Sequence, residues 1–89
     1  MSQDSIKRSS ANNKHTYFTY DLGCSAALIS SGFKLIGLDK QNPRKVQFIF
    51  ERTEEIEKAV DDYCFGKLKI NARTFFENIR LLKNRIYSS

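Results

Sequence analysis

The chain has 89 residues, of which 40% are apolar, and a formal net charge of +5 at pH 7. This length predicts one small domain with a single hydrophobic core and excludes a core that also encloses a deep substrate cavity. Two cysteines and one histidine are too few for a structural zinc site, and no apolar run is long enough to span a membrane.

The N-terminal stretch, residues 1–15, is polar, and Ile6 is its one sizeable apolar residue after Met1. Little in this stretch can be buried to offset the entropy lost on ordering. We therefore expect a disordered, mildly basic arm over 1–15, followed by a single domain over 16–88.

A strand and a helix are predicted next. Residues 16–20 are β-branched or aromatic, which favours a short strand. Asp21 is a suitable N-cap for a helix over 22–31. Gly32 suits the left-handed position that follows this helix, and Phe33 suits the apolar position that packs back on its last turn.

Segment 33–51 is expected to form a β-hairpin. Phe48 and Phe50 share one face of its second strand, so we predict that both are in the core. The connection KQNPRK, residues 40–45, contains a proline that cannot donate to a strand ladder, and it concentrates three cations. We expect residues 39–45 to form the hairpin loop.

A second helix is predicted to begin at Thr53 as N-cap and to end at Gly66. Glu54 and Glu55 then lie in the first turn, where the helix dipole favours negative charge. Apolar residues at helical spacing predict a core stripe of Ile56, Ala59, Val60, Tyr63 and Cys64.

Asn71 is a suitable N-cap for a final helix over 72–87. Lys83 falls on the apolar face of that helix, where it either extends to solvent near the helix end or faces a ligand at the edge of the core. The core face is predicted to consist of Ala72, Phe75, Phe76, Ile79, Leu82 and Ile86.

The element order β-α-β-β-α-α indicates an α+β fold, in which a small three-stranded sheet packs against helices that lie mainly on one face. Cys24 and Cys64 are expected to be reduced and largely buried, and a disulfide between them is the alternative. With no secretory signal in the sequence, we expect a cytoplasmic protein.

The sequence predicts no catalytic site. Nucleophilic catalysis needs a nucleophile beside a base, and the one histidine, His15, lies in the predicted arm. The carboxylates of the second helix fit helix capping and a solvated face, and the four glycines are isolated from one another. We expect no enzymatic activity, no cofactor, no metal and no small-molecule substrate.

Charge is distributed unevenly. Segment 34–45 contains four cations and one carboxylate, segment 67–89 six cations and one carboxylate, and segment 46–66 two cations and six carboxylates. Clustered cations favour phosphate contacts. The leading hypothesis is a module that binds nucleic acid, either DNA or RNA, with help from the arm. The predicted contacts are Lys40, Arg44, Lys45, Lys67, Lys69, Arg73, Arg80, Lys83 and Arg85.

Each basic feature also has a purely structural interpretation. A polar KQNPRK loop is typical of a solvated hairpin tip, and Glu77 at helical spacing from Arg73 and Arg80 is typical of surface ion pairs.

The alternative function is a protein–protein adaptor or inhibitor of a phage or bacterial complex that uses its acidic helix or a strand edge. Among the rings available for base stacking, Tyr17 is expected to be the most exposed.

Three segments of the chain, YFTYDLGCSAALISSGFKLIGLD, FIFE and FFENIRLLKNRIYS, resemble a small domain-of-unknown-function family of bacterial and phage genomes. The shared pattern is an aromatic and hydroxyl start before Asp-Leu, a Gly-Phe after the first helix, a Phe-x-Phe strand and an end near Leu-Lys-x-Arg-Ile-Tyr. The resemblance spans 17–88 and implies a single compact module of bacteria and their mobile elements. It implies no activity and no site residues.

Overall fold

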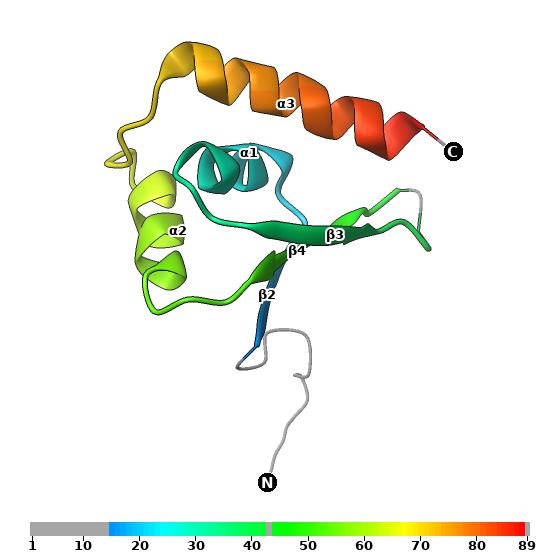
Figure 1. Cartoon of the computed structure of the whole chain (residues 1–89), viewed down its shortest axis with the longest axis horizontal. Helices are drawn as coiled ribbons and strands as arrows, with labels where there is room; N and C mark the ends of the chain where they lie inside the picture. The colour runs from blue at the N-terminus through cyan, green and yellow to red at the C-terminus, as the bar shows by residue number, and fades with distance from the viewer. Residues whose placement is uncertain (1–14, 43, 89) are drawn as a thin grey trace, which may run out of the picture.

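The computed structural model describes residues 15–42 and 44–88, so the predicted arm lies outside the described residues except for His15. The element order confirms the predicted α+β succession β-α-β-β-α-α (Figure 1). The elements are β2 (Thr16–Thr19), α1 (Leu22–Ser30), β3 (Leu35–Asp39), β4 (Gln47–Glu51), α2 (Ile56–Cys64) and α3 (Ala72–Tyr87).

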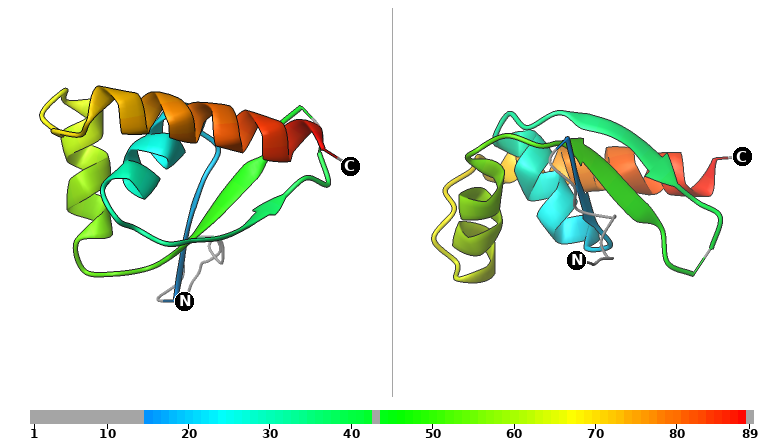
Figure 2. Two further views of the ribbon diagram at one scale, coloured as in Figure 1. Left: turned by 45° about the horizontal axis from the view of Figure 1, so that its top comes forward. Right: turned by 90° about the horizontal axis from the view of Figure 1, so that it is seen from below.

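The described residues form a three-stranded antiparallel sheet with the order β2-β4-β3. Phe48 lies opposite Thr19 and Leu38, and Phe50 lies opposite Tyr17 and Leu35. Side chains alternate along a strand, and an irregularity between Leu35 and Gly37 shifts the register of β3, so these residues share one face of the sheet. Helices α1 and α3 are stacked above the sheet in Figure 1, and the view from below in Figure 2 has the strands in front of α3.

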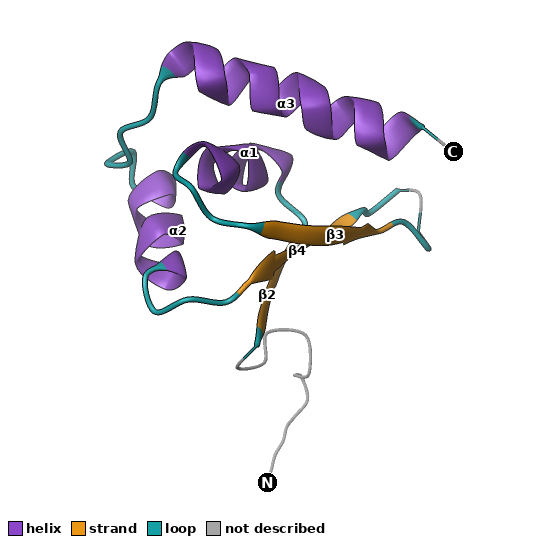
Figure 3. Cartoon of the chain, in the orientation of Figure 1, coloured by secondary structure: helices purple, strands orange, loops and turns teal. Residues whose placement is uncertain are grey.

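Helix α1 lies at the centre of the fold, between α3 and the sheet (Figure 3). Its residues 24–28 are all buried, because α2, α3 and the sheet surround it. Asp21 caps its N-terminus by accepting a 2.9 Å hydrogen bond from the Cys24 amide. Gly32 has φ 97°, and the Phe33 amide donates to the Leu28 carbonyl at 3.0 Å. The predicted capping at both ends of α1 is therefore confirmed.

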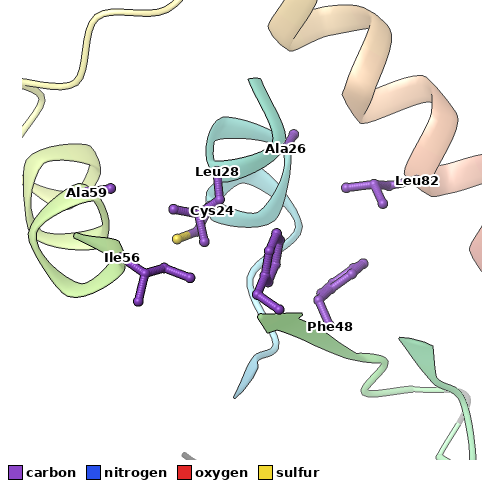
Figure 4. Packing of buried hydrophobic residues seen from close by; sticks show 8 residues of the cluster. Cys24, Ala26, Leu28, Phe48, Ile56, Ala59 and Leu82 are labelled. Atoms are coloured by element: carbon purple, nitrogen blue, oxygen red, sulfur yellow. The ribbon is translucent and has the colours of Figure 1, made fainter. Parts of the chain in front are cut away.

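The core is formed where the three helices and the sheet meet (Figure 4). Its fully buried large side chains come from α1, β4, α2 and α3, and burying each one contributes about 1.5–3 kcal/mol. The predicted burial of Phe48 and Phe50 is confirmed. The cluster contains Cys24, Ala26, Leu28, Phe48, Phe50, Ile56, Ala59 and Leu82.

Two predictions for α2 are wrong. The helix begins at Ile56 and not after Thr53, because the Ile56 amide donates to the Thr53 carbonyl in a turn that lets Ile56 enter the core. Cys64 is exposed, since it is the last residue of the helix and lies one position beyond Tyr63, which packs against the core. Both cysteines are free thiols.

Helix α3 has the predicted bounds, and Asn71 caps it by accepting a 3.0 Å hydrogen bond from the Thr74 amide. The predicted core face is partly wrong, because Phe76 is 60% exposed and Ala72 and Lys83 are exposed as well. Packing on α1 uses a narrower stripe. This stripe consists of Phe75, Ile79, Leu82 and Ile86, at spacings of four, three and four residues.

A polar contact helps to set the rotation of α3 about its own axis. Asn78 Nδ2 donates a 2.9 Å hydrogen bond to Ser30 Oγ at the end of α1. This contact lies on the side of the helix away from Phe76, since residues two positions apart do not face each other. The side of α3 that contains Phe75 and Asn78 therefore faces α1, and Phe76 and Lys83 face solvent.

Candidate nucleic-acid interface

Lys40, the first cation of the KQNPRK loop, does not point into open solvent. Its Nζ donates to the Arg85 carbonyl at 3.0 Å and to the Ser88 carbonyl at 2.7 Å. These acceptors are at the C-terminus of α3, where unpaired carbonyls and the helix dipole favour a cation. Lys40 therefore ties the hairpin loop to the end of α3, and the loop does more than reverse the chain.

A cleft of about 230 Å³ opens beside this junction. Tyr20 and Tyr87, at its rim, are 53% and 82% exposed. The prediction that Tyr17 would be the exposed ring is wrong, because Tyr17 lies opposite Phe50 on the core face of the sheet and packs against the core. The cleft is lined by Tyr20, Leu22, Arg44, Lys45, Val46, Phe48, Ile86 and Tyr87.

The ring of Tyr20 is held by two neighbours. The Nζ of Lys45 lies 4.6 Å from the ring centroid, within the range of a cation–π contact. Gln47 Nε2 donates to the Tyr20 hydroxyl at 3.3 Å. The ring is thus oriented before any ligand arrives, with a loop cation already beside it.

The outer face of α3 continues from this cleft. Phe76, Arg80, Lys83 and Tyr87 follow at intervals of four, three and four residues, so all four lie on one side of the helix. The Arg80 guanidinium lies 6.0 Å from the Phe76 ring centroid. On this face two cations lie between two rings, and the face meets the cleft at Tyr87.

We use the term basic aromatic surface for the combination of the loop cations, the cleft tyrosines and the outer face of α3. Its contact residues come from four places in the sequence: the residue after β2, the KQNPRK loop, the middle of α3 and the end of α3. They are Tyr20, Arg44, Lys45, Phe76, Arg80, Lys83 and Tyr87.

The other predicted contacts are not part of this surface. Lys67 and Lys69 precede α3, and its 16 residues separate them from the hairpin loop by about 24 Å. Arg73 Nε lies 3.4 Å from Glu77 Oε2, which confirms the predicted ion pair and reduces the charge available for phosphate. Arg85 is two positions from Lys83 and from Tyr87, and so points away from the outer face.

Lys67 and Lys69 lie instead beside the acidic helix α2. The amides of Lys67 and Leu68 donate to the Asp62 carbonyl at 2.7 and 3.1 Å, which holds the start of this connection against the helix end. The connection between α2 and α3, which contains Lys67 and Lys69, and the hairpin loop between β3 and β4 lie at opposite ends of α3 (Figure 3), so the nine predicted cations do not form one surface.

A second cleft, of about 350 Å³, was not predicted from the sequence. It lies between α2 and α3, and the alternation of lysine with Leu68 and Ile70 over 67–70 was the available signal. Phe65, which is 75% exposed, lies in the chain between the lining residues Tyr63 and Gly66. The cleft is lined by Tyr63, Gly66, Leu68, Ile70, Ala72 and Phe75.

The thiol of Cys24 is suited to packing and not to nucleophilic attack. Burial raises its pKa to about 11, with a smaller contribution from the charge of Asp21. A thiol with this pKa is protonated at neutral pH, and the thiolate is the reactive form. Within residues 15–42 and 44–88, no group of three or more His, Cys, Asp or Glu residues could hold a metal ion.

Comparison with known proteins identifies a family. The family described as a domain of unknown function (DUF5659) matches residues 14–88, a range that includes every residue that the structure describes. Neither the curated proteins nor the solved structures gave a match. Of the helices in the described residues, none combines the length and the apolar character needed to cross a membrane.

Proposed function

The chain belongs to the DUF5659 family, a domain of unknown function, and we propose that it is a non-enzymatic module that binds nucleic acid through the phosphate backbone. The binding site in this proposal is the basic aromatic surface. The proposed setting is the cytoplasm of a bacterium, in the service of either the host or a phage.

The observation that carries the proposal is the attachment of the KQNPRK loop to α3. Segment 40–45 supplies Arg44 and Lys45 to this surface, segment 80–87 supplies Arg80 and Lys83, and neither segment contains a carboxylate. The two hydrogen bonds from Lys40 hold these segments side by side. Binding to a nucleic-acid backbone strengthens with each phosphate that a cation neutralises, so joining two basic segments creates a site that neither would form alone.

The exposed rings give the surface a second property of nucleic-acid sites. Phe76 and Tyr87 are 60% and 82% exposed, so neither ring serves mainly to fill the core. Each has a cation as its neighbour on the outer face. Exposed rings beside cations are typical of proteins that hold both phosphates and bases. Exposed aromatic rings do not improve solubility, so solubility alone does not explain this surface.

The test uses the full chain and fluorescence anisotropy of labelled oligonucleotides at salt concentrations from 50 to 200 mM. One variant combines Arg44→Gln with Lys45→Gln, and a second combines Arg80→Gln with Lys83→Gln. Each pair should lower the salt slope by roughly 1.4–1.8 at most, which corresponds to two lost phosphate contacts. The losses should be similar for all sequences, because backbone contacts carry no base information.

The matched control is Lys67→Gln combined with Lys69→Gln, which removes the same charge at the other end of α3. We expect the control to keep the wild-type salt slope. Equal losses in the control and in the surface pairs would show that net charge alone drives binding. Absence of nucleic-acid affinity at low salt would refute the proposal.

A second candidate function is a protein–protein module, and the apolar cleft between α2 and α3 favours it. Lys67 and Lys69 flank its lining residues Leu68 and Ile70 in the sequence, so an apolar segment with acidic neighbours is the complementary partner. A pull-down with and without nuclease separates the two functions. Partner proteins that survive nuclease but are lost with Ile70→Glu would favour the protein module.

A further inference from the structure

We infer that the cleft between Tyr20 and Tyr87 takes one unstacked base, so that the preferred ligand is single-stranded nucleic acid. This inference rests on the proposed function and makes its ligand class specific. Three features of the basic aromatic surface support it: the shape of the cleft, the position of its cations and the second ring site at Phe76.

The first feature is the combination of size and lining. At about 230 Å³ the cleft is below the usual range for drug-sized ligands, and so has room for a single ring system. Its inner wall includes the partly buried side chains of Leu22, Val46 and Ile86. Two tyrosine rings stand at the rim. An apolar wall below exposed rings suits the flat face of a base.

The second feature is the position of the loop cations. Arg44 and Lys45 line the same cleft as the two tyrosines. A base that enters the cleft brings its own phosphate to the rim, within reach of these side chains. The Lys45 ammonium now rests 4.6 Å from the Tyr20 ring centroid, and it is free to exchange this contact for the phosphate when the base arrives.

The third feature is a second ring on the same helix face. Phe76 precedes Tyr87 by eleven residues, which is a rise of roughly 16 Å along α3. At 3.4 Å per nucleotide of a stacked strand, this distance corresponds to about five nucleotides, and to fewer in an extended strand. Arg80 and Lys83 lie between the two rings and are placed to contact the intervening phosphates.

A duplex cannot use this arrangement. In a double helix the base faces are covered by their neighbours, so exposed rings have nothing on which to stack. The rings on the outer face would then contribute little to the affinity for a duplex, and only the cations would contact it. The inference therefore predicts that removing a ring weakens single-strand binding and leaves duplex binding unchanged.

The experiment measures the affinity of the full chain for an oligothymidylate of about eight nucleotides and for a duplex of equal length. Tyr87→Ala is the test variant, because a side chain that is 82% exposed can be removed without unfolding the domain. We expect a loss of roughly 5- to 150-fold on the single strand, which is the effect of one lost base–ring stack. Duplex affinity should stay at the wild-type value.

The matched control is Phe65→Ala, which removes an aromatic side chain that is 75% exposed at the end of α2. It should leave both affinities unchanged. An oligothymidylate with a single 2-aminopurine gives a second readout. Its fluorescence should be quenched by the wild type and by Phe65→Ala, and quenched less by Tyr87→Ala.

The outcomes separate the inference from the proposed function. If Tyr87→Ala binds the single strand like the wild type while the cation pairs weaken it, the base cleft is refuted and phosphate binding stands. If the duplex binds more tightly than the single strand, the ligand class is wrong. If neither ligand binds at low salt, both proposals fail.

Discussion

Helices α1 and α3 are neighbours in the fold, but they use their side chains in opposite ways. In α1, five of nine residues are buried, and neighbours cover the helix on several sides. In α3, Leu82 is the one buried residue among the 16 that the structure describes. The comparison shows that α1 buries far more of its length than α3 does, while most of the α3 surface is exposed.

The exposed aromatic residues sharpen this difference. Single exposed apolar side chains are common in proteins and need no explanation, but Phe76 and Tyr87 share one helix face with two cations. That face has no packing role, because α3 contacts α1 through the stripe that contains Phe75 and Leu82. The expected separation of stability from binding can be tested by changing matched residues in the two regions.

The largest effect is expected from emptying the core. Phe48→Ala should lower the free energy of unfolding by about 3–5 kcal/mol, since it removes a fully buried ring. In a domain of this size such a loss is comparable to the whole stability. Phe76→Ala, the matched change on α3, should cost less than about 1 kcal/mol. Urea denaturation followed by circular dichroism measures both, and similar losses would contradict the assignment of the two faces.

A smaller loss is expected from overpacking α1. Ala27 is fully buried, so Ala27→Leu forces extra atoms into a filled site and should cost about 1–3 kcal/mol. Ala72→Leu makes the same change on the exposed first turn of α3 and should be nearly neutral. Thermal melts of the two variants compare them directly. If Ala27→Leu melts like the wild type, α1 is less tightly surrounded than the structure indicates.

Alkaline pH should reveal the buried thiol. The pKa of Cys24 is raised to about 11 in the folded state from a usual value of 9.0. Above pH 9 the unfolded chain loses this proton before the folded chain does, so stability falls as pH rises toward 11. The slope from this group is at most about 1.4 kcal/mol per pH unit.

The test compares urea denaturation at pH 8, 9, 10 and 11 in two cysteine variants under reducing conditions. Cys24→Ala should have a shallower decline with pH than the wild type, whatever its stability at pH 8. Cys64→Ala is the control, because its thiol is exposed. An identical decline in all three proteins would show that Cys24 ionises without hindrance in the folded state.

The smallest effect is expected from the link between the loop and α3. Lys40→Met removes two hydrogen bonds to the end of the helix and should cost about 0.3–1 kcal/mol, the usual value for a cation at an exposed helix C-terminus. Lys69→Met, on an exposed lysine elsewhere, should have no effect. Amide exchange in the last turn of α3 should quicken only in Lys40→Met, and unchanged exchange would show that the link contributes nothing.

The sequence by itself determined the local elements of this protein. Asp21 and Asn71 cap α1 and α3 as predicted, Gly32 has the left-handed conformation, and the bounds of α3 agree with the expected 72–87. These features depend on hydrogen bonds and dihedral preferences that span a few residues, so they are readable from short segments.

The candidate site was only partly predictable. Arg44, Lys45, Arg80 and Lys83 were expected as contacts from clustered charge, and the structure places them on one surface. Tyr20 and Tyr87 were not predicted as contacts, and Phe76 was assigned to the core. Alternation along a strand does not say which of its faces is covered, and a ring at the end of a helix is exposed or buried according to what packs there.

Only the tertiary structure decided how these elements share the core and the surface. Helix α3 has apolar residues on more than one flank, so its sequence allows more than one flank to pack on the core. Packing against α1 and the hydrogen bond between Asn78 and Ser30 select the orientation in which Phe76 is exposed. The partner of Lys40 is 45 residues away in the chain. Contacts of this kind depend on the meeting of distant segments, and no local propensity or spacing encodes them.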